Sequence, residues 1–393
     1  MTVRDSQQFD GTGVAFIPAR PLETACEHAC RAVVEGRELC VISPGRPLPQ
    51  AQDARAGYLQ CETSGSTGPA KRIRRSLRSW QACFETDRKL WQITPRDRIA
   101  VMGPLSNSLT LYGLFAAQHL GATPVVIDTD RPDERLRRLA EAAPMLLYTT
   151  PTQLRQLGTG GQGSVGSVRR VLAGGGFLDR AAREAAARLF PEARLTGFYG
   201  AAETSFITLD ETGGAEGSVG RPYPGVTLRV RDDAGRDLPA GETGTIWVES
   251  PYLFDSYAAG TAPDTRWDNG FLSVGELGWL SESGALFLAG RRSRMFTVAD
   301  RNVFPEAIES FLLSLPGLTA AAVLPEPDPA RGNLPVAFVS GADLDTSALL
   351  SACRQRFGPG AAPRRIVTLD ALPALPSGKS DLRALAALLG QGA

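Results

Sequence analysis

The sequence predicts an α/β protein with a large N-terminal domain and a small C-terminal domain. Between residues 98 and 190, short apolar runs alternate with longer helical patterns, which is typical of helices layered on a largely parallel sheet. Between residues 219 and 288, short strand-like runs alternate with Asp/Gly turns and indicate a small β-rich subdomain. From residue 298 onward, helices and strands form a compact α+β unit. A chain of 393 residues is long enough for two such domains.

The first 57 residues contain few clear structural signals. A helix is expected over residues 22–35, followed by a short strand at Leu39–Ile42 that ends at Ser43-Pro44-Gly45. The apolar run Tyr58–Cys61 then leads, as a strand, into a loop rich in Gly, Ser and Thr.

Strands and helices alternate after this loop. The expected helices are Leu77–Leu90, Leu109–Leu120, Glu134–Ala143 and Asp179–Phe190. The expected strands are Arg98–Met102, Thr123–Ile127, Met145–Thr149 and Val168–Ala173. Three glycines, Gly174–Gly176, stop the last of these strands. The N-terminal domain is therefore expected to consist of layered α/β subdomains.

The last third of the chain changes character. Strands are expected at Thr227–Arg231, Gly244–Glu249, Ala320–Leu324 and Pro335–Val339. Helices are expected near 305–314, at Thr346–Phe357 and at Ser380–Leu389. The boundary falls near Gly290–Met295, so the predicted domains are residues 1–291 and 292–393.

Charge and cysteine content restrict the class of protein. Basic and acidic residues both number 42, so the chain lacks the excess positive charge of a general nucleic-acid binder. The six cysteines show no metal-binding spacing, and the two histidines argue against a zinc site or a His-based triad. Neither a signal-peptide pattern nor an 18-residue apolar run occurs. We expect a reduced, cytoplasmic protein with no membrane span and no nucleic-acid partner; the oligomeric state stays unknown.

The segment TSGSTGPAK has the chemistry of an anion-binding loop. Its glycines let backbone N–H groups approach a ligand closely, its hydroxyls can donate hydrogen bonds, and Lys71 adds a positive charge. It is not a Walker loop, because Ala70-Lys71-Arg72 stands where Gly-Lys-Ser/Thr would be required. The alternative is a flexible linker. The predicted binding residues are Thr63, Ser64, Gly65, Ser66, Thr67, Gly68 and Lys71. The basic residues up to Arg78 are expected to form a solvated helix face beside the anion site.

Two further segments hold charged residues suited to a metal ion and to an anion. Glu203, in GFYGAAET, offers a carboxylate to Mg²⁺, which prefers oxygen ligands. The alternative is a strand-to-helix corner with a surface glutamate. Lys379 follows a Pro-Ser-Gly turn, ahead of a helix capped by Ser380 or Asp381, from which its ammonium could be swung into a site to neutralise an anion. The alternative is a turn with an incidental surface lysine.

Taken in order, these segments resemble the motifs of the adenylate-forming superfamily, which comprises acyl-CoA synthetases, adenylation domains of peptide synthetases and luciferases. Thr63–Lys71 is similar to T-S-G-S/T-T-G-x-P-K, with the Pro and the variable residue exchanged. Tyr199–Glu203 is similar to Y-G-x-T-E, and Leu375–Arg383 to the pattern around the mobile lysine. The resemblance covers most of the chain and implies a small, mobile C-terminal domain. The segment ahead of the first motif is markedly shorter than in the superfamily.

The resemblance implies which residues bind the nucleotide. Tyr199–Gly200 would lie near the adenine, and Gly175–Gly176 would provide flat backbone for the adenine and the acyl group. Glu276, where the superfamily has Asp, and Arg291 would bind the ribose hydroxyls. Ala202 stands where a Thr normally contacts the α-phosphate, so one hydrogen bond is lost.

Two departures concern the C-terminal domain. Ser293 stands at the hinge, where related enzymes carry Asp or Lys, and a small residue can still absorb a backbone rotation. Asp300 replaces a Gly of the segment that lines the pantetheine tunnel. A charged side chain there would obstruct CoA or select a different acceptor.

The implied reaction is ATP-dependent activation of a carboxylic acid with Mg²⁺, followed by transfer to CoA or to carrier-protein pantetheine. Glu203 would hold the metal, Lys71 the phosphates and Lys379 the transition state. The predicted acyl-pocket residues are Asn107, Tyr112, Phe177 and Ala201. Because no Asp occurs between residues 104 and 113 to pair an α-amino group, a fatty, short-chain or aryl acid is expected. The alternatives are carrier-protein loading or amide formation, and a binding protein that no longer turns over.

Overall fold

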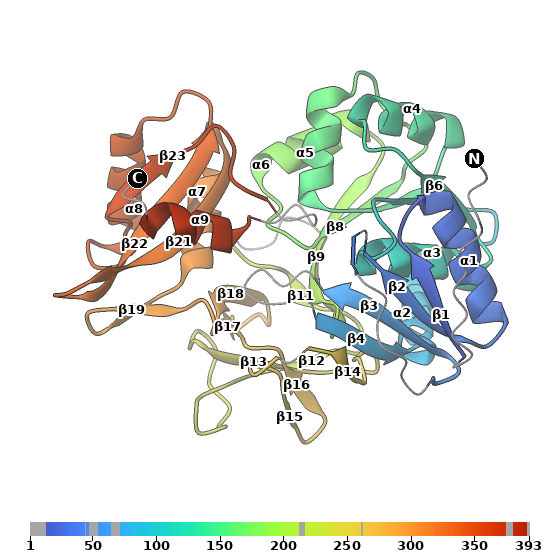
Figure 1. Ribbon diagram of the computed structural model, residues 1–393, viewed down its shortest axis with the longest axis horizontal. Helices are drawn as coiled ribbons and strands as arrows, with labels where there is room; N and C mark the ends of the chain where they lie inside the picture. Colours follow the sequence, from blue (N-terminus) through green and yellow to red (C-terminus); the bar gives the residue numbers. More distant parts are fainter. Residues whose placement is uncertain are drawn as a thin grey trace. The chain divides into compact units, whose positions relative to one another are not determined.

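The computed structural model describes residues 13–43, 45–46, 54–63, 71–211, 217–260, 262–374 and 380–390. They form two compact units (Figure 1). The first takes the described residues of 1–63, 70–227 and 249–262, and the second those of 228–248 and 263–393. The predicted fold class, layered α/β with a β-rich part and a small C-terminal α+β part, is confirmed. The predicted boundary at residues 291 and 292 stays a prediction.

The first unit contains a five-stranded sheet in the order β1-β2-β3-β4-β14. Its strands are β1 (Val14–Pro18), β2 (Glu38–Ile42), β3 (Tyr58–Thr63), β4 (Lys71–Ser76) and β14 (Ser256–Ala259). The first three are parallel, whereas β4 runs antiparallel to both β3 and β14. Helix α1 (Leu22–Val34) connects β1 to β2. Strand β1 lies in a stretch for which the sequence analysis predicts no element.

A seven-stranded sheet in the same unit has the order β11-β10-β9-β8-β7-β5-β6. Its strands are β5 (Arg98–Met102), β6 (Thr123–Ile127), β7 (Leu146–Thr149), β8 (Arg170–Gly174), β9 (Arg194–Ala201), β10 (Ser205–Asp210) and β11 (Arg221–Pro222). The five strands β5 to β9 are parallel, as predicted, and β10 and β11 continue the sheet antiparallel. Loops that follow the parallel strands therefore emerge at one edge.

Successive side chains of each strand point to opposite faces of the seven-stranded sheet, and helices cover these faces. In β5, Ala100 and Met102 join the core cluster that contains residues of α4 (Pro132–Ala142), α5 (Pro151–Gly160) and α6 (Arg180–Leu189). Helix α3 (Ser108–Leu120) packs on β5, β6 and β7 and against α2 (Leu77–Trp91). A Cβ at Gly113 of α3 would lie 3.0 Å from the side chains of Val101 and Tyr148, so a small residue allows this close packing.

The basic segment after the predicted anion loop is a strand, not the solvated helix face that the sequence predicts. In β4, Arg74 is 8% exposed and Arg75 is fully buried. Arg74 pairs through its Nε, at 2.6 Å, with Glu38, a fully buried carboxylate on β2. For the residues of β4 the prediction was wrong, because the partners that allow arginine to be buried come from distant parts of the chain. Arg78, exposed at the start of α2, agrees with it.

A buried carboxylate lies among three tyrosines in the first unit. Asp87 of α2 is fully buried and accepts hydrogen bonds from Tyr112 (2.6 Å), Tyr148 (3.0 Å) and Tyr223 (2.6 Å). Burial raises the pKa of Asp87 to about 7, although the three hydroxyls act in the opposite direction. The cluster joins α2, α3 and β7 to the segment that follows β11.

We expect this cluster to make folding stability depend on pH. The folded state holds the proton of Asp87 up to about pH 7, whereas the ordinary value is 3.8. The contribution of this group to the free energy of unfolding therefore falls by roughly 4 kcal/mol as pH rises between these two values. Above pH 7 this contribution no longer changes with pH. Asp87→Asn keeps an acceptor but cannot ionise. In urea denaturation its stability relative to wild type should be higher at pH 8 than at pH 5; an equal difference at both pH values contradicts the expectation.

The second unit contains a six-stranded sheet and the C-terminal α+β part. The first sheet consists of β12 (Thr227–Arg231), β13 (Gly244–Glu249), β15 (Arg266–Asp268), β16 (Phe271–Ser273), β17 (Glu276–Leu280) and β18 (Leu286–Arg291). The hairpin β19 (Phe296–Val298) and β20 (Arg301–Val303) leads into α7 (Pro305–Ser314).

A three-stranded sheet forms the core of the C-terminal part. It consists of β21 (Leu318–Asp328), β22 (Gly332–Gly341) and β23 (Arg365–Thr368). Helices α7 and α8 (Thr346–Phe357) share one hydrophobic cluster with this sheet, and α9 (Leu382–Gly390) shares a second one. Asp381 accepts hydrogen bonds from the N–H groups of Arg383 and Ala384 and so caps α9.

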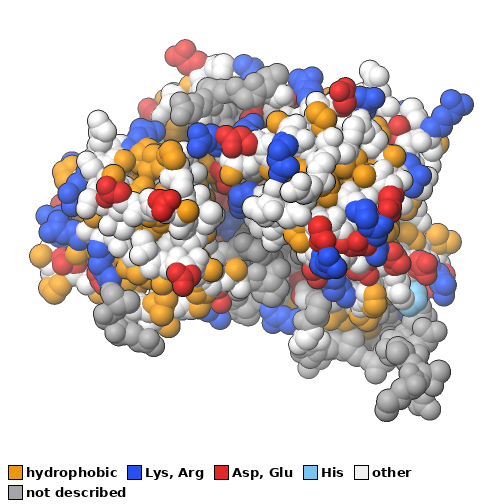
Figure 2. Space-filling view, turned by 90° about the horizontal axis from the view of Figure 1, so that it is seen from above, with side chains coloured by type: hydrophobic (Ala, Val, Ile, Leu, Met, Phe, Trp, Pro, Cys, Tyr) orange, Lys and Arg blue, Asp and Glu red, His pale blue; other side chains and the backbone are white. Residues whose placement is uncertain are grey.

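The surface fits the charge balance of the sequence. On the face seen in Figure 2, basic and acidic side chains are interspersed. No helix within the described ranges is long and apolar enough to span a bilayer.

Candidate active site

Loops with the predicted nucleotide residues follow neighbouring parallel strands of the seven-stranded sheet. Ala173 pairs with Gly197 and Gly174 with Phe198, so the segments after β8 and β9 leave the sheet at the same edge. A Cβ at Gly174 would lie 2.3 Å from the Phe198 ring, which requires glycine there. Beyond it, Gly175 and Gly176 are exposed, and Gly175 has a φ of +79°. This exposed backbone is available to a flat ligand.

Glu203 lies in the tight turn between β9 and β10. A Cβ at Gly200 would come within 2.0 Å of the carbonyl oxygen of Ser205, so only glycine allows the two strands to approach this closely. The hydroxyl of Thr204 accepts a hydrogen bond from the N–H of Ala201 at 3.0 Å. Glu203 itself is 9% exposed. The alternative of a strand-to-helix corner with a surface glutamate is therefore wrong.

Two polar side chains from separate strands, Tyr257 and Lys71, lie beside this turn and its Glu203. The Tyr257 hydroxyl, on β14, donates a hydrogen bond to Oε1 of Glu203 at 2.8 Å. The Nζ atom of Lys71, at the start of β4, lies 5.8 Å from the centre of the Tyr257 ring. Gly260 keeps this corner narrow, since a Cβ there would lie 3.2 Å from Cα of Lys71. The convergence brings a cation and a carboxylate to one place.

Two predicted segments lie outside the described residues. They contain Ser64, Gly65, Ser66, Thr67 and Gly68 in one case, and Lys379 in the other. The residues that flank them are described. Thr63 pairs with Lys71 across β3 and β4, and Ala374 forms a β-bridge with Ser380. In both cases the two flanking residues lie side by side.

The two predicted ribose ligands are neighbours in the second unit. Glu276 on β17 and Arg291 on β18 are register partners, and the Arg291 Nε donates to Oε1 of Glu276 at 2.9 Å. Glu276 is 7% exposed. The pair is an acceptor and a donor that are oriented by each other.

The predicted acyl-pocket residues separate into two groups. Asn107, Phe177 and Ala201 follow or end β5, β8 and β9, so they share the edge of the sheet described above, and Phe177 is 44% exposed. Tyr112 is instead 4% exposed and donates its hydroxyl to Asp87. The structure therefore does not bring Tyr112 together with the other three.

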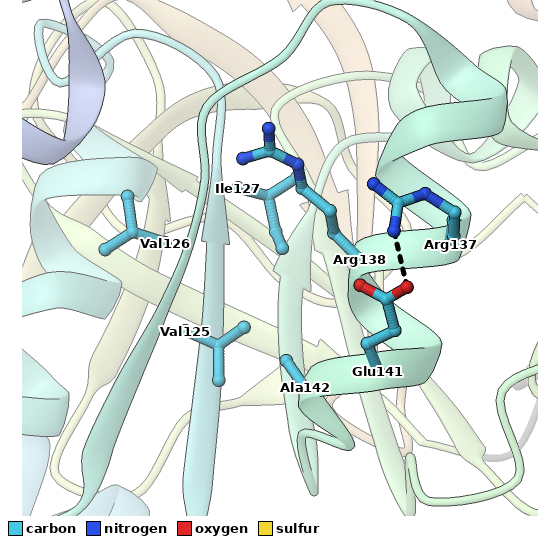
Figure 3. Close-up of a pocket in the computed structure, with 7 residues that line it drawn as sticks. All are labelled: Val125, Val126, Ile127, Arg137, Arg138, Glu141 and Ala142. Atoms are coloured by element: carbon cyan, nitrogen blue, oxygen red, sulfur yellow. Dashed lines mark hydrogen bonds and ion pairs between the residues drawn. The ribbon is translucent and has the colours of Figure 1, made fainter.

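A separate hollow of about 470 Å³ lies between β6 and α4 (Figure 3). It is lined by Val125, Val126, Ile127, Arg137, Arg138, Glu141 and Ala142. Its arginines are already paired, Arg137 with Glu134 and Glu141, and Arg138 with Glu134. None of the predicted site residues lines it, so we do not assign it to the nucleotide.

Residues 19–258 match the sequence model of the AMP-binding enzyme family, and residues 307–379 match that of the AMP-binding enzyme C-terminal domain. The chain belongs to the AMP-binding enzyme family. The resemblance stated from the motifs is thus confirmed. Lys71, Glu203 and Tyr257 all fall within the first matched region of this AMP-binding enzyme, and Lys379 is the last residue of the second.

Curated relatives of this AMP-binding enzyme are CoA ligases by name. An uncharacterized acyl–CoA ligase of Bacillus subtilis is 32% identical over 339 residues, which are 85% of this chain and 68% of the relative. The 2-succinylbenzoate–CoA ligase of the same organism is 28% identical, over 81% of this chain and 66% of the relative.

Solved structures share the fold. The o-succinylbenzoate CoA synthetase of B. subtilis, in complex with an acyl-adenylate intermediate, has a TM-score of 0.76 at 22% identity and covers 95% of this chain and 87% of its own. The amide bond synthetase of Marinactinospora thermotolerans has a TM-score of 0.75 at 25% identity, over 96% of this chain and 80% of its own.

Sequence reasoning missed Tyr257 in this AMP-binding enzyme. It lies on a short strand, SYAA, whose composition carries no catalytic signal. Its contact with Glu203 becomes visible only in the structure, where the pairing of Tyr257 with Ile73 aligns β14 with β4.

Proposed function

We propose that this chain activates a carboxylic acid with ATP to an acyl-adenylate and then transfers the acyl group to CoA. The observation that supports this most directly is the convergence of Lys71, Tyr257 and Glu203 at the residues that flank the predicted phosphate loop. In the first step a carboxylate oxygen attacks the α-phosphorus of ATP, and the bond to pyrophosphate breaks. In the second step the CoA thiol attacks the acyl carbonyl, and AMP leaves.

The main barrier in the first step is crowded negative charge. Catalysis therefore consists of positioning and cations. Lys71 neutralises phosphate oxygens at the phosphate loop, and Lys379 stabilises the charge that develops on the carboxylate and α-phosphate. Glu276 accepts hydrogen bonds from the ribose, and Arg291 holds Glu276 in place.

The residues present fit a magnesium ion. Among the described residues no group of three His, Cys, Asp or Glu could form an all-protein metal site. Mg²⁺ needs no such group, because it keeps several waters and is commonly held by one or two carboxylates together with substrate phosphates. Glu203 would be that carboxylate, with Oε1 oriented by Tyr257. When bound, the ion neutralises and aligns the phosphates.

The natural acid is proposed only as a class. Asn107, Phe177 and Ala201 offer an amide, an aromatic ring and a small side chain, respectively. None of them is a carboxylate that could pair an α-amino group. We propose a fatty, short-chain or aryl acid. A cytoplasmic location fits, because ATP and CoA are available there and because all six cysteines are unpaired.

Amide formation is the second candidate. Asp300, where the superfamily has Gly, is exposed in the two-residue turn between β19 and β20. A carboxylate there suits a cationic amine better than the polyanionic CoA. The 25% identity to an amide bond synthetase agrees with this alternative.

Two assays test these functions. ATP–pyrophosphate exchange across a panel of fatty, short-chain, aryl and amino acids should show exchange with at least one of the first three classes. Silence with every acid would contradict adenylation and favour a nucleotide- or acyl-binding protein. For an active acid, AMP release that depends on CoA supports the ligase, whereas release that depends on an amine or on a carrier protein supports the alternative.

Tyr257→Phe tests whether the Tyr257 hydroxyl orients the Glu203 carboxylate for Mg²⁺. Loss of the hydroxyl removes the hydrogen bond to Oε1, so the Mg²⁺ concentration that gives half-maximal exchange should rise about tenfold, a size typical of partners that orient metal ligands. Tyr58→Phe is the matched control, because its hydroxyl binds Asp255 at 3.2 Å at an exposed position. Equal Mg²⁺ dependence of the two variants would contradict the role of Tyr257.

A further inference from the structure

Arg75 is a fully buried cation on the same strand as Lys71. In β4, side chains alternate between the two faces of the sheet, so Lys71, Ile73 and Arg75 point to one side and Arg72 and Arg74 to the other. Arg74 finds an acidic partner in Glu38 on its side. Arg75 donates instead to neutral oxygens, which is unusual for a buried charge.

The hydrogen bonds of Arg75 join the two segments that carry Glu203 and Tyr257. Its Nη1 donates to the carbonyl of Ala202, the residue before Glu203, at 3.2 Å. Its Nη2 donates to the carbonyl of Tyr252, in the segment that leads to Tyr257. One planar guanidinium thus reaches both segments with two different nitrogens, whereas the donors of a lysine all sit on a single nitrogen and are not held in a fixed plane.

Further contacts fasten these two segments to each other. The Ser205 hydroxyl donates to the same Tyr252 carbonyl at 3.0 Å, and the N–H of Phe254 donates to the Glu203 carbonyl at 2.8 Å. The guanidinium carbon of Arg75 lies 4.9 Å from the centre of the Trp80 ring, which is 1% exposed. The ring limits the positions that the guanidinium can take.

We propose that Arg75 is a positioning residue of the nucleotide site, which fixes the Glu203 turn and the Tyr257 strand with respect to Lys71. The proposal rests on the proposed function only for its ligand, MgATP. Arg75 acts through backbone carbonyls and touches no reacting atom. Its loss should loosen the carboxylate that binds the metal and leave the binding of metal-free ATP nearly unchanged.

The test compares four variants by calorimetric titration with ATP, once with Mg²⁺ and once with EDTA. Arg75→Met should weaken MgATP binding about tenfold, the lower end of the range for groups that orient metal ligands, and change metal-free binding by less than about twofold. Arg75→Lys should recover part of the loss. Arg74→Met and Arg74→Lys are the matched controls, since that buried arginine lies next in sequence and faces away; they should lower the melting temperature without changing the ratio of the two affinities.

A purely structural role for Arg75 predicts a different result. The Arg75 variants would then lose thermal stability as the Arg74 variants do, with an unchanged ratio of MgATP to ATP affinity, and that result would overturn the proposal. If neither Arg75 variant folds, Trp80→Leu removes the ring beside the guanidinium and must shift the same ratio. Wild type separates the two hypotheses: binding of MgATP without pyrophosphate exchange contradicts only the proposed function, and absence of MgATP binding contradicts both.

Discussion

Lys379→Ala should lower the rate of adenylate formation by about a thousandfold, the upper range for the loss of one transition-state donor. The ammonium is predicted to stabilise charge that develops only as the carboxylate approaches the α-phosphate. The loss should therefore appear in kcat, with little change in the KM for ATP. The measurement is the initial rate of ATP–pyrophosphate exchange at saturating Mg²⁺ with the best acid of the panel.

The chain offers a clear control for this prediction. Lys89 lies exposed in the last turn of α2, so Lys89→Ala removes the same charge from a surface position. It should retain the wild-type rate. We expect rotation of the C-terminal domain about Ser293 to remove Lys379 from the site and admit the thiol, so the Lys379→Ala variant given synthetic acyl-adenylate and CoA should still form thioester. Full exchange activity in this variant would refute the assigned role of Lys379.

Glu203→Gln should reduce kcat/KM for MgATP by about a hundredfold, because a metal that stabilises phosphate charge contributes several kcal/mol. The amide keeps the size of the side chain and can still accept a hydrogen bond from Tyr257. It lacks the charge that binds Mg²⁺. Higher Mg²⁺ should recover part of the activity, and the exchange rate as a function of Mg²⁺ concentration measures this.

Glu211→Gln is the matched control for Glu203→Gln. Glu211 directly follows β10, is 39% exposed in its side chain and pairs with Arg194 at 3.3 Å. Its neutralisation should leave exchange and Mg²⁺ dependence unchanged. If Glu203→Gln behaved like this control, the metal would have to be held by another group.

Local pattern predicted most of the fold. The strands Arg98–Met102 and Thr123–Ile127 are present with the predicted bounds, because continuous apolar runs bounded by turn residues specify buried parallel strands locally. The strand β4 was not predicted, because KRIRRS carries four basic residues and such a composition is typical of a solvent-exposed segment. Its burial depends on Glu38 and on backbone carbonyls far along the chain.

The candidate site shows the same division. Lys71 and Glu203 are visible in the sequence because each belongs to a motif with its own chemical pattern. Tyr257 is 54 residues from Glu203, and Arg75 is 127 residues from Ala202. No local pattern relates such residues. Tyr112 shows the converse, because the resemblance to the superfamily implied a pocket position for it, whereas its hydroxyl donates to the buried Asp87.

The sequence by itself determined the family, the order of the elements and the charged groups available for phosphate chemistry, because motifs and hydrophobic periodicity are properties of short stretches. Only the tertiary structure decided which charges are buried and which side chains meet. The pairing of β4 with β14 and the turn between β9 and β10 bring the Tyr257 hydroxyl to Glu203 and the Arg75 guanidinium to the carbonyls of Ala202 and Tyr252. Strand pairing between distant segments creates these contacts, and hydrogen bonds across it compensate the cost of burying the charges.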